Sequence, residues 1–297
     1  MERGDFHGEE TLVLESEHLT IEVLAEAGPR IVRARLDGSS ENILGEVPDV
    51  GWDTPWGRYQ LRGGHRLWFT PENPPLTSVP DEGDLAVNEL PHGIRLERLE
   101  PQPGLRKSME IELVSDRPAL TVKHAIRNEG EAACLHSPWA LTVLPLGGVA
   151  VLPQQRGPIG GNELLPNRTL TLWPYSSISD ARLELGDELI LVHGRPAPVE
   201  FKIGYLNRAG WAGYLRGDLF FVKHFDPQAE LEHPDLGSNV EVFCDARVLE
   251  LETVAPLVHL QPGAATEHTE RWELHRVGKV EHETGDLTAM LSELGLT

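Results

Sequence analysis

The stretch GSNVEVFCDARVLELET, residues 237–253, contains two runs of alternating apolar side chains on either side of a short polar corner. A period of two is typical of strands that bury one face, so the stretch predicts a β-hairpin of residues 239–245 and 248–253. The register of that hairpin places Glu241 directly opposite Glu252, while the valines and leucines between the acidic residues face the core. The hairpin therefore sets two carboxylates opposite each other in an antiparallel sheet.

The facing carboxylates of Glu241 and Glu252 need an explanation, because opposed like charges destabilise a strand pair. A cation, a shared proton or a hydrogen-bonding ligand between them removes that cost, and a shared proton raises one pKa of the pair. An ordinary solvent-exposed polar face is the alternative. The sequence indicates no metal or cofactor, although the two carboxylates with nearby oxygens offer the ligands that calcium prefers.

Short alternating runs bounded by glycine, proline, aspartate and asparagine recur along the chain. They predict antiparallel strands at residues 11–14, 19–24, 30–36, 94–99, 109–114, 120–126, 188–192, 219–223 and 269–274. Helical periodicity first becomes clear at residues 286–294, where four apolar residues form one stripe and Asp286 can cap the first turn. Residues 52–84 are rich in glycine, proline and tryptophan and predict a long loop. The expected fold is all-β, a single domain of residues 1–297 with a short C-terminal helix.

Composition limits the partners that the chain can have. The 297 residues include 26 Lys plus Arg and 47 Asp plus Glu, a net charge of -21, which opposes binding to nucleic acid or to an anionic membrane. The apolar runs are too short to span a bilayer and the N-terminal residues lack the apolar core of a signal peptide, so we expect a cytoplasmic protein. Two cysteines are too few for a disulfide framework. The sequence leaves the oligomeric state open.

A second group of candidate residues lies in GGHRLWFTPE, residues 63–72. The glycine pair allows the backbone to come close to a ligand, while His65, Arg66 and Trp68 supply hydrogen-bond donors and an aromatic surface. This combination suits a sugar, which presents hydroxyl groups on one side and an apolar C–H face on the other. The alternative is a loop that Trp68 anchors to the core, with His65 at the surface.

Three further polar residues interrupt apolar runs. His136 precedes Pro138 in ACLHSPWAL and has the side chain of a general acid near neutral pH; a hydrogen-bonded structural histidine is the alternative. Lys202 and Lys223 each lie within an apolar run and are expected to neutralise the carboxylates of the hairpin. Lysines that protect an edge strand from aggregation are the competing interpretation for both.

The order of these motifs resembles that of the aldose 1-epimerases, also called galactose mutarotases. Residues 251–253 followed by 258–274 are similar to the end of that family, where a strand with a glutamate precedes an L-x-P-G turn and an H-T-x-x-W-like strand. HSPWAL, residues 136–141, resembles the N-H-S-Y-F-N-L segment of the family. Further similar segments are residues 63–65, which resemble its first histidine motif, and residues 28–31 and 42–45, which resemble its opening hairpin.

The resemblance implies a galactose mutarotase-like β-supersandwich from a bacterial branch of the superfamily, with a small-molecule carbohydrate as its ligand. It implies Glu252 as the catalytic base and His136 or His65 as the acid. The side chains expected to bind the substrate in one open cleft are Arg66, Trp68, Lys202, Lys223, Asn239 and Glu241. Two other interpretations stay open: a non-catalytic carbohydrate-recognition or sensor protein, and a lyase or hydrolase on the same scaffold.

Overall fold

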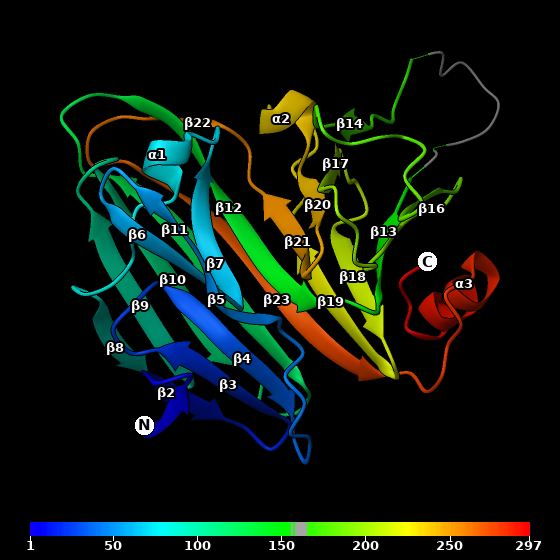
Figure 1. The fold of residues 1–297 in the computed structure, drawn as a ribbon, viewed down its shortest axis with the longest axis horizontal. Helices are drawn as coiled ribbons and strands as arrows, with labels where there is room; N and C mark the ends of the chain where they lie inside the picture. Colours follow the sequence, from blue (N-terminus) through cyan, green and yellow to red (C-terminus); the bar gives the residue numbers. More distant parts are fainter. Residues whose placement is uncertain (156, 158–164) are drawn as a thin grey trace.

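The computed structural model describes residues 1–155, 157 and 165–297, and two large antiparallel sheets make up most of it (Figure 1). The first sheet has the spatial order β1 (Glu2–Phe6), β2 (Glu9–Glu15), β3 (Leu19–Leu24), β4 (Arg30–Leu36), β7 (His65–Thr70), β12 (Cys134–Pro145), β21 (Val248–Val254), β20 (Val240–Cys244), β17 (Phe201–Tyr205) and β14 (Thr171–Leu172), and β22 (Val258–Leu260) pairs with β12. The second sheet has the order β15 (Leu183–Leu185), β16 (Leu189–His193), β13 (Val149–Pro153), β18 (Trp211–Arg216), β19 (Leu219–Phe225), β23 (Ala265–Arg276), β11 (Ala119–Asn128), β10 (Leu105–Leu113), β9 (Gly93–Glu100) and β8 (Ala86–Leu90).

The alternating runs in the sequence are strands in the structure, so the predicted all-β class is confirmed. The hairpin of β20 and β21 has the predicted register, with Glu241 opposite Glu252 and Phe243 opposite Glu250. Val240, Val242, Leu249 and Leu251 of this hairpin join apolar residues of the second sheet in one core between the layers. Successive residues of a strand point to opposite faces, and the core between the sheets therefore fixes which side chains of the first sheet point away from it.

The outer face of the first sheet is buried as well. A separate hairpin of β5 (Glu46–Thr54) and β6 (Gly57–Gly63) covers it, and Tyr59 and Leu61 of that hairpin pack with Trp68, Trp139 and Val254 in a second apolar cluster. The middle of the first sheet is consequently protected from water on both faces.

The prediction of a long loop at residues 52–84 is wrong. This part of the chain contains the end of β5, all of β6 and β7, and the short helix α1 (Pro74–Thr77). Every residue of β7, HRLWFT, is buried, and a strand buried on both faces shows no alternation of polarity. The glycine pair before β7 was expected to let the backbone approach a ligand. In the structure it allows close packing against β4, because a Cβ on Gly64 would lie 2.0 Å from the Ile31 carbonyl oxygen.

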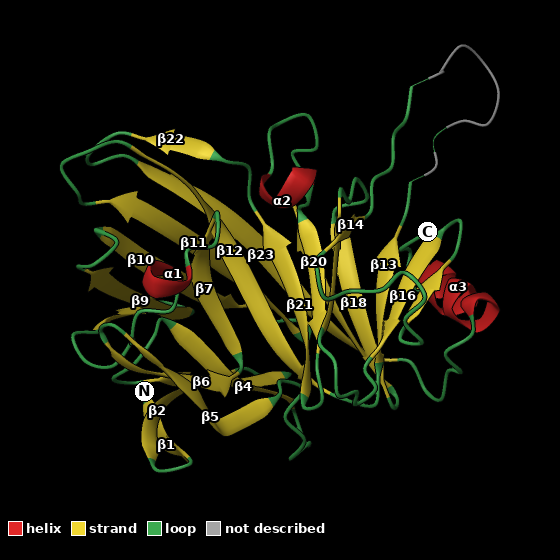
Figure 2. Cartoon of the chain, turned by 45° about the horizontal axis from the view of Figure 1, so that its top comes forward, coloured by secondary structure: helices red, strands yellow, loops and turns green. Residues whose placement is uncertain are grey.

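Helices occupy only the periphery (Figure 2). The predicted C-terminal helix is α3 (Thr284–Glu293), and Leu287, Met290 and Leu291 pack on the outer face of the second sheet. Asp286 lies in its first turn but does not cap it, because the helix begins earlier, after Glu283. The helices of the described residues are too short and too polar to cross a membrane.

Candidate functional site

Five neighbouring strands of the first sheet, β7, β12, β21, β20 and β17, bring the polar residues of the outer face together. In register, one row across the sheet consists of Arg66, Leu141, Glu252, Glu241 and Gly204. A Cβ on Gly204 would lie 3.3 Å from Glu241 Cγ and 2.6 Å from the Ser238 hydroxyl. A glycine at this position therefore leaves room for the glutamate side chain.

Lys202 of β17 reaches diagonally across the sheet to both carboxylates. Its Nζ lies 2.7 Å from Glu241 Oε2 and 2.9 Å from Glu252 Oε2, so the predicted cation between the facing glutamates is Lys202. Burial alone lowers the pKa of Lys202, but the two carboxylates outweigh it and raise the pKa above its usual value. The ammonium group occupies the place between the carboxylates where a calcium ion was considered.

Glu241 and Glu252 differ in their environments. Burial raises the pKa of Glu241 well above its usual value, Lys202 offsets this only in part, and the neighbouring carboxylates of Glu252 and Asp235 raise it further. Burial therefore favours the protonated, uncharged form of Glu241. Glu252 Oε2 accepts hydrogen bonds from Lys202 and, at 2.8 Å, from Trp139 Nε1. The pair thus offers a proton donor beside a proton acceptor.

The two glutamates also have free bonding capacity. Glu241 Oε1 and Glu252 Oε1 are buried and have no hydrogen-bond partner among the described residues. An unsatisfied buried carboxylate oxygen is costly unless a ligand or water bonds to it. The expectation of an open cleft is wrong for these side chains, because Glu241 and Glu252 are each 1% exposed and Lys202 is 5% exposed.

Two tryptophans enclose the ammonium group of Lys202. Its Nζ lies 4.6 Å from the ring centroid of Trp139 and 4.7 Å from that of Trp173, within the range of cation–π attraction. Ser176 ties the segment that carries Trp173 to β17, since its hydroxyl donates to the Lys202 carbonyl at 2.6 Å. Sequence analysis missed Trp173 and the nearby Tyr175. Their signal was the pair of aromatic residues in LWPYSS, just after a very short strand.

Arg66 and Trp68 lie on the same outer face as Glu252 but already have partners. The Arg66 guanidinium makes a forked pair with Glu250, with distances of 3.1 and 2.9 Å, and lies 4.3 Å from the centroid of the Trp68 ring. Trp68 Nε1 donates to the Tyr59 hydroxyl at 3.2 Å. Their expected contact with a substrate stays a prediction.

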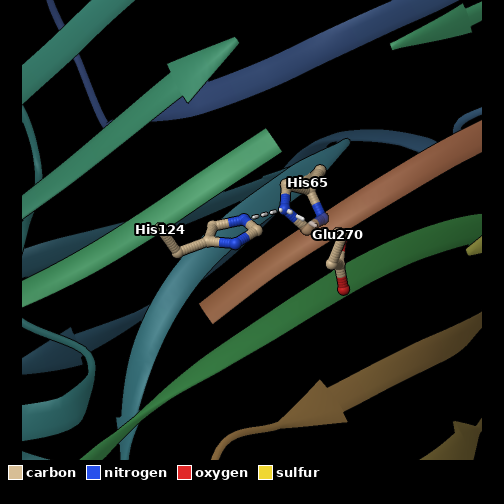
Figure 3. A group of neighbouring side chains, drawn as sticks. All are labelled: His65, His124 and Glu270. Carbon is tan, nitrogen blue, oxygen red and sulfur yellow. Dashed lines mark hydrogen bonds and ion pairs between the residues drawn. The ribbon is translucent and has the colours of Figure 1, made fainter. Parts of the chain in front are cut away.

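His65 and Lys223 lie on the other side of the sheet, between the two layers, and are fully buried. His65 Nε2 is hydrogen-bonded to His124 Nε2 at 2.7 Å (Figure 3), and Lys223 Nζ pairs with Glu270 at 2.6 Å. The expectation that Lys223 neutralises the hairpin carboxylates, and that His65 shares a site with Glu252, is wrong. Adjacent strand residues point to opposite faces, so the outward direction of Arg66 turns His65 inward.

His65, His124 and Glu270 together have the residue types of a metal site, since one ligand atom of each lies within 4.8 Å of the others. Their contacts fit a hydrogen-bond network better. One hydrogen bond joins Nε2 of His65 and Nε2 of His124. His124 Nδ1 donates to the His268 carbonyl at 3.0 Å, and Trp272 Nε1 donates to Glu270 at 2.8 Å. Lys223 supplies the positive charge that a metal ion would bring.

The other two predicted residues have structural contacts. His136 is half-buried on the core side of β12, where its Nδ1 lies 3.2 Å from the Thr70 carbonyl and its ring packs on Phe69. The structure therefore does not bring either predicted acid, His136 or His65, to the face that carries Glu252. Asn239 is buried just before β20, and its side chain bonds the backbone of Asn207 and Pro227.

The buried network between the sheets predicts how stability depends on pH. Burial lowers the pKa values of His65, His124 and His268, the last to about 3, despite the attraction of Glu270. The unfolded chain binds protons at these histidines below about pH 6.5 while the folded chain does not, and each such group costs about 1.4 kcal/mol per pH unit. We expect the free energy of unfolding, measured in urea, to be fully retained above pH 7 and to fall between pH 6.5 and 5. A flat profile over that interval would show that these histidines are charged in the folded protein.

Comparison with known proteins defines the class of fold. No family model and no curated protein sequence matches the chain, whereas solved structures do. A TPR-domain containing protein from Parabacteroides distasonis has a TM-score of 0.63 at 15% identity, covering 93% of this chain and 50% of its own, so the chain spans half the length of that protein. A proposed mutarotase, YeaD from Salmonella typhimurium, has a TM-score of 0.59 at 12% identity, covering 92% and 93%.

A proposed aldose 1-epimerase from Klebsiella pneumoniae has a TM-score of 0.56 at 12% identity, covering 99% of this chain and 85% of its own. These identities are too low to transfer an activity, and the similarity shows the fold alone. The chain is a galactose mutarotase-like β-sandwich, as the sequence predicted.

Proposed function

We propose that the protein binds a carbohydrate on the outer face of its first sheet and interconverts the anomers of an aldose. The observation that carries this proposal is the pair of facing glutamates, Glu241 and Glu252, clamped by Lys202 against Trp139. The similarity of the fold to that of a proposed aldose 1-epimerase supports the proposal. Trp139 and Trp173 supply aromatic surface for the C–H face of a sugar ring.

The chemistry needs one acid and one base. As the base, Glu252 takes the proton of the anomeric hydroxyl, the bond between the anomeric carbon and the ring oxygen breaks, and the ring oxygen receives a proton from the acid. The open-chain aldehyde then turns about its C1–C2 bond, and the reverse steps close the ring on the other face. Because burial favours the protonated form of Glu241 and both expected histidines lie elsewhere, we assign the acid to Glu241.

Access to the pair requires a covering side chain to move. Trp173 packs on Lys202 and is partly exposed, so a shift of its ring would open the pair to a sugar while the ring stays beside the site. The buried state of the cluster also favours the second candidate, a carbohydrate-recognition protein without turnover, in which the same face binds a sugar but no proton is transferred.

Exchange NMR spectroscopy of free aldoses tests this function. The wild-type protein is expected to accelerate the interconversion of α and β anomers of at least one aldose in a panel of hexoses and pentoses. Heat-denatured protein at the same concentration is the control. Saturable binding without acceleration of any aldose would exclude the epimerase and leave the recognition protein.

A further inference from the structure

The enclosure of the carboxylate pair has one part that is not a strand. The ammonium group of Lys202 contacts Glu241 and Glu252, and it also has cation–π contacts with Trp139 and Trp173. The two glutamates, the lysine and Trp139 belong to neighbouring strands of the first sheet, whereas Trp173 directly follows the short strand β14. Trp173 can therefore move away from the ammonium group without separating any of the strands that carry the site.

Residues 173–176 form a β-turn. The Ser176 amide donates to the Trp173 carbonyl at 2.9 Å, and Pro174 occupies the second position of the turn, where proline is favoured because its φ is already fixed. Pro174 and Tyr175 are exposed. Because the backbone bond and the proline stiffen the turn, the indole of Trp173 and the hydroxyl of Ser176 are expected to move together.

The beginning of this turn is anchored to the rest of the protein. Both residues of β14 pair with β17, and Figures 1 and 2 show the two strands side by side. Thr171 of β14 is buried, and its hydroxyl donates at 3.4 Å to the Asp235 carbonyl of the short helix α2 (Pro234–Gly237). This end is consequently fixed, and we expect any movement of the turn to pivot about it.

The other end of the turn is held by one side chain. The Ser176 hydroxyl accepts a hydrogen bond from the Lys202 amide at 2.7 Å and donates one to the Lys202 carbonyl at 2.6 Å. One hydroxyl thus satisfies both backbone groups of Lys202 at the edge of β17, as a neighbouring strand would. The next serine, Ser177, bonds to Ser179 instead. The hydroxyl of Ser176 therefore fastens the turn beside the residue that clamps both glutamates.

We infer that the turn of residues 173–176 is a gate. While Ser176 is bonded to Lys202 the gate shuts off the carboxylate pair, and release of the hydroxyl lets Trp173 swing aside and admits the sugar. The inference rests on the proposed carbohydrate function and adds a means of controlling it. Exposed elements at a sheet edge open more readily than the core. Because the sugar binds only the open state, the apparent affinity falls in proportion to the fraction of protein that is open.

Ser176→Ala tests the gate, because it removes both bonds to Lys202 and keeps the backbone bond of the turn. Calorimetric titration with D-galactose, D-glucose and D-xylose is expected to show an affinity about tenfold higher than that of the wild type. NMR line shapes should assign this gain to faster association at an unchanged dissociation rate, since the hydroxyl stabilises only the closed state. A lid that closes over bound sugar would instead give weaker binding and faster dissociation.

Hydrogen exchange of the Lys202 amide reports the opening of the gate without any sugar, since this amide donates to Ser176. Ser176→Ala should speed its exchange by about tenfold or more. The Asn207 amide is the internal reference, because it also donates to a side chain, Asn239 Oδ1 at 2.6 Å, but lies outside the turn. Unchanged exchange at Asn207 shows that the variant is folded.

Two further variants serve as controls. Ser176→Thr keeps the hydroxyl, and Ser177→Ala removes one that bonds within its own turn; both should behave as the wild type.

The outcomes separate this inference from the proposed function. An affinity that Ser176→Ala leaves unchanged or lowers, or unchanged exchange of the Lys202 amide in that variant, would overturn the gate. If a sugar is bound in those cases, the proposed function stands. A sugar bound by Ser176→Ala but not measurably by the wild type would support both. Failure of all three sugars to bind either protein would overturn both.

Discussion

Replacing Lys223 with methionine is expected to lower the free energy of unfolding by about 3–5 kcal/mol, because it leaves the Glu270 carboxylate buried without its cation. Lys223 Nζ lies 2.6 Å from Glu270, and both side chains are fully buried between the sheets. Burial lowers the pKa of Lys223, while the ammonium group of Lys223 holds the pKa of Glu270 well below its usual value despite burial. Urea denaturation at pH 7.5 measures the loss.

The double variant Lys223→Met, Glu270→Gln serves as the control for this prediction. Removal of both charges should recover a substantial part of the lost stability, since an uncharged pair has no uncompensated ion to bury. A loss of less than about 1 kcal/mol in Lys223→Met would mean that the pair contributes no more than an exposed surface ion pair. A double variant less stable than Lys223→Met would also contradict the account.

Glu252→Gln is expected to reduce the rate of anomer exchange by about a hundredfold to ten-thousandfold, the usual effect of removing a general base. The amide cannot take the proton of the anomeric hydroxyl, but it keeps the size of the side chain. Its oxygen can still accept the hydrogen bond from Trp139. Sugar affinity should therefore stay within a few-fold of the wild-type value, and exchange NMR together with calorimetry measures both quantities.

His136→Ala distinguishes the structural assignment from the one based on sequence. His136 lies on the core side of β12, bonded to the Thr70 carbonyl, so its loss should change the exchange rate by no more than a few-fold. Glu241→Gln, by contrast, should be as slow as Glu252→Gln, because it removes the assigned acid. A rate that falls with His136→Ala but not with Glu241→Gln would restore the histidine as the acid.

The sequence predicted much of the scaffold and part of the site. Alternation of polarity revealed the half-buried strands and the register that faces Glu241 with Glu252. Lys202 was predicted as their counter-charge, since a cation inside an apolar run needs an anion nearby, and its contacts with both carboxylates are confirmed. The local pattern carried enough information for the glutamate pair because β20 and β21 are consecutive strands of one hairpin.

The errors arose where a strand is buried on both faces. In HRLWFT every side chain is buried, so hydrophobicity does not tell which of His65 and Arg66 faces the other sheet. Alternation along a strand requires the side chains of His65 and Arg66 to point to opposite faces. This rule was not applied because the segment was predicted to be a loop. Lys223 has the same apolar context as Lys202, and only the sheet to which its strand belongs decides that it pairs with Glu270.

Indole N–H signals in a ¹H–¹⁵N spectrum offer the most direct test of where a sugar binds. Trp139 and Trp272 are matched, since each indole donates to a buried glutamate at 2.8 Å, Glu252 on the outer face and Glu270 between the sheets. Phenylalanine variants of the two tryptophans assign the signals. During titration with a binding sugar, the Trp139 signal is predicted to shift saturably while that of Trp272 stays in place. Saturable binding that leaves Trp139 unchanged would contradict a carbohydrate site at Glu241, Glu252 and Lys202.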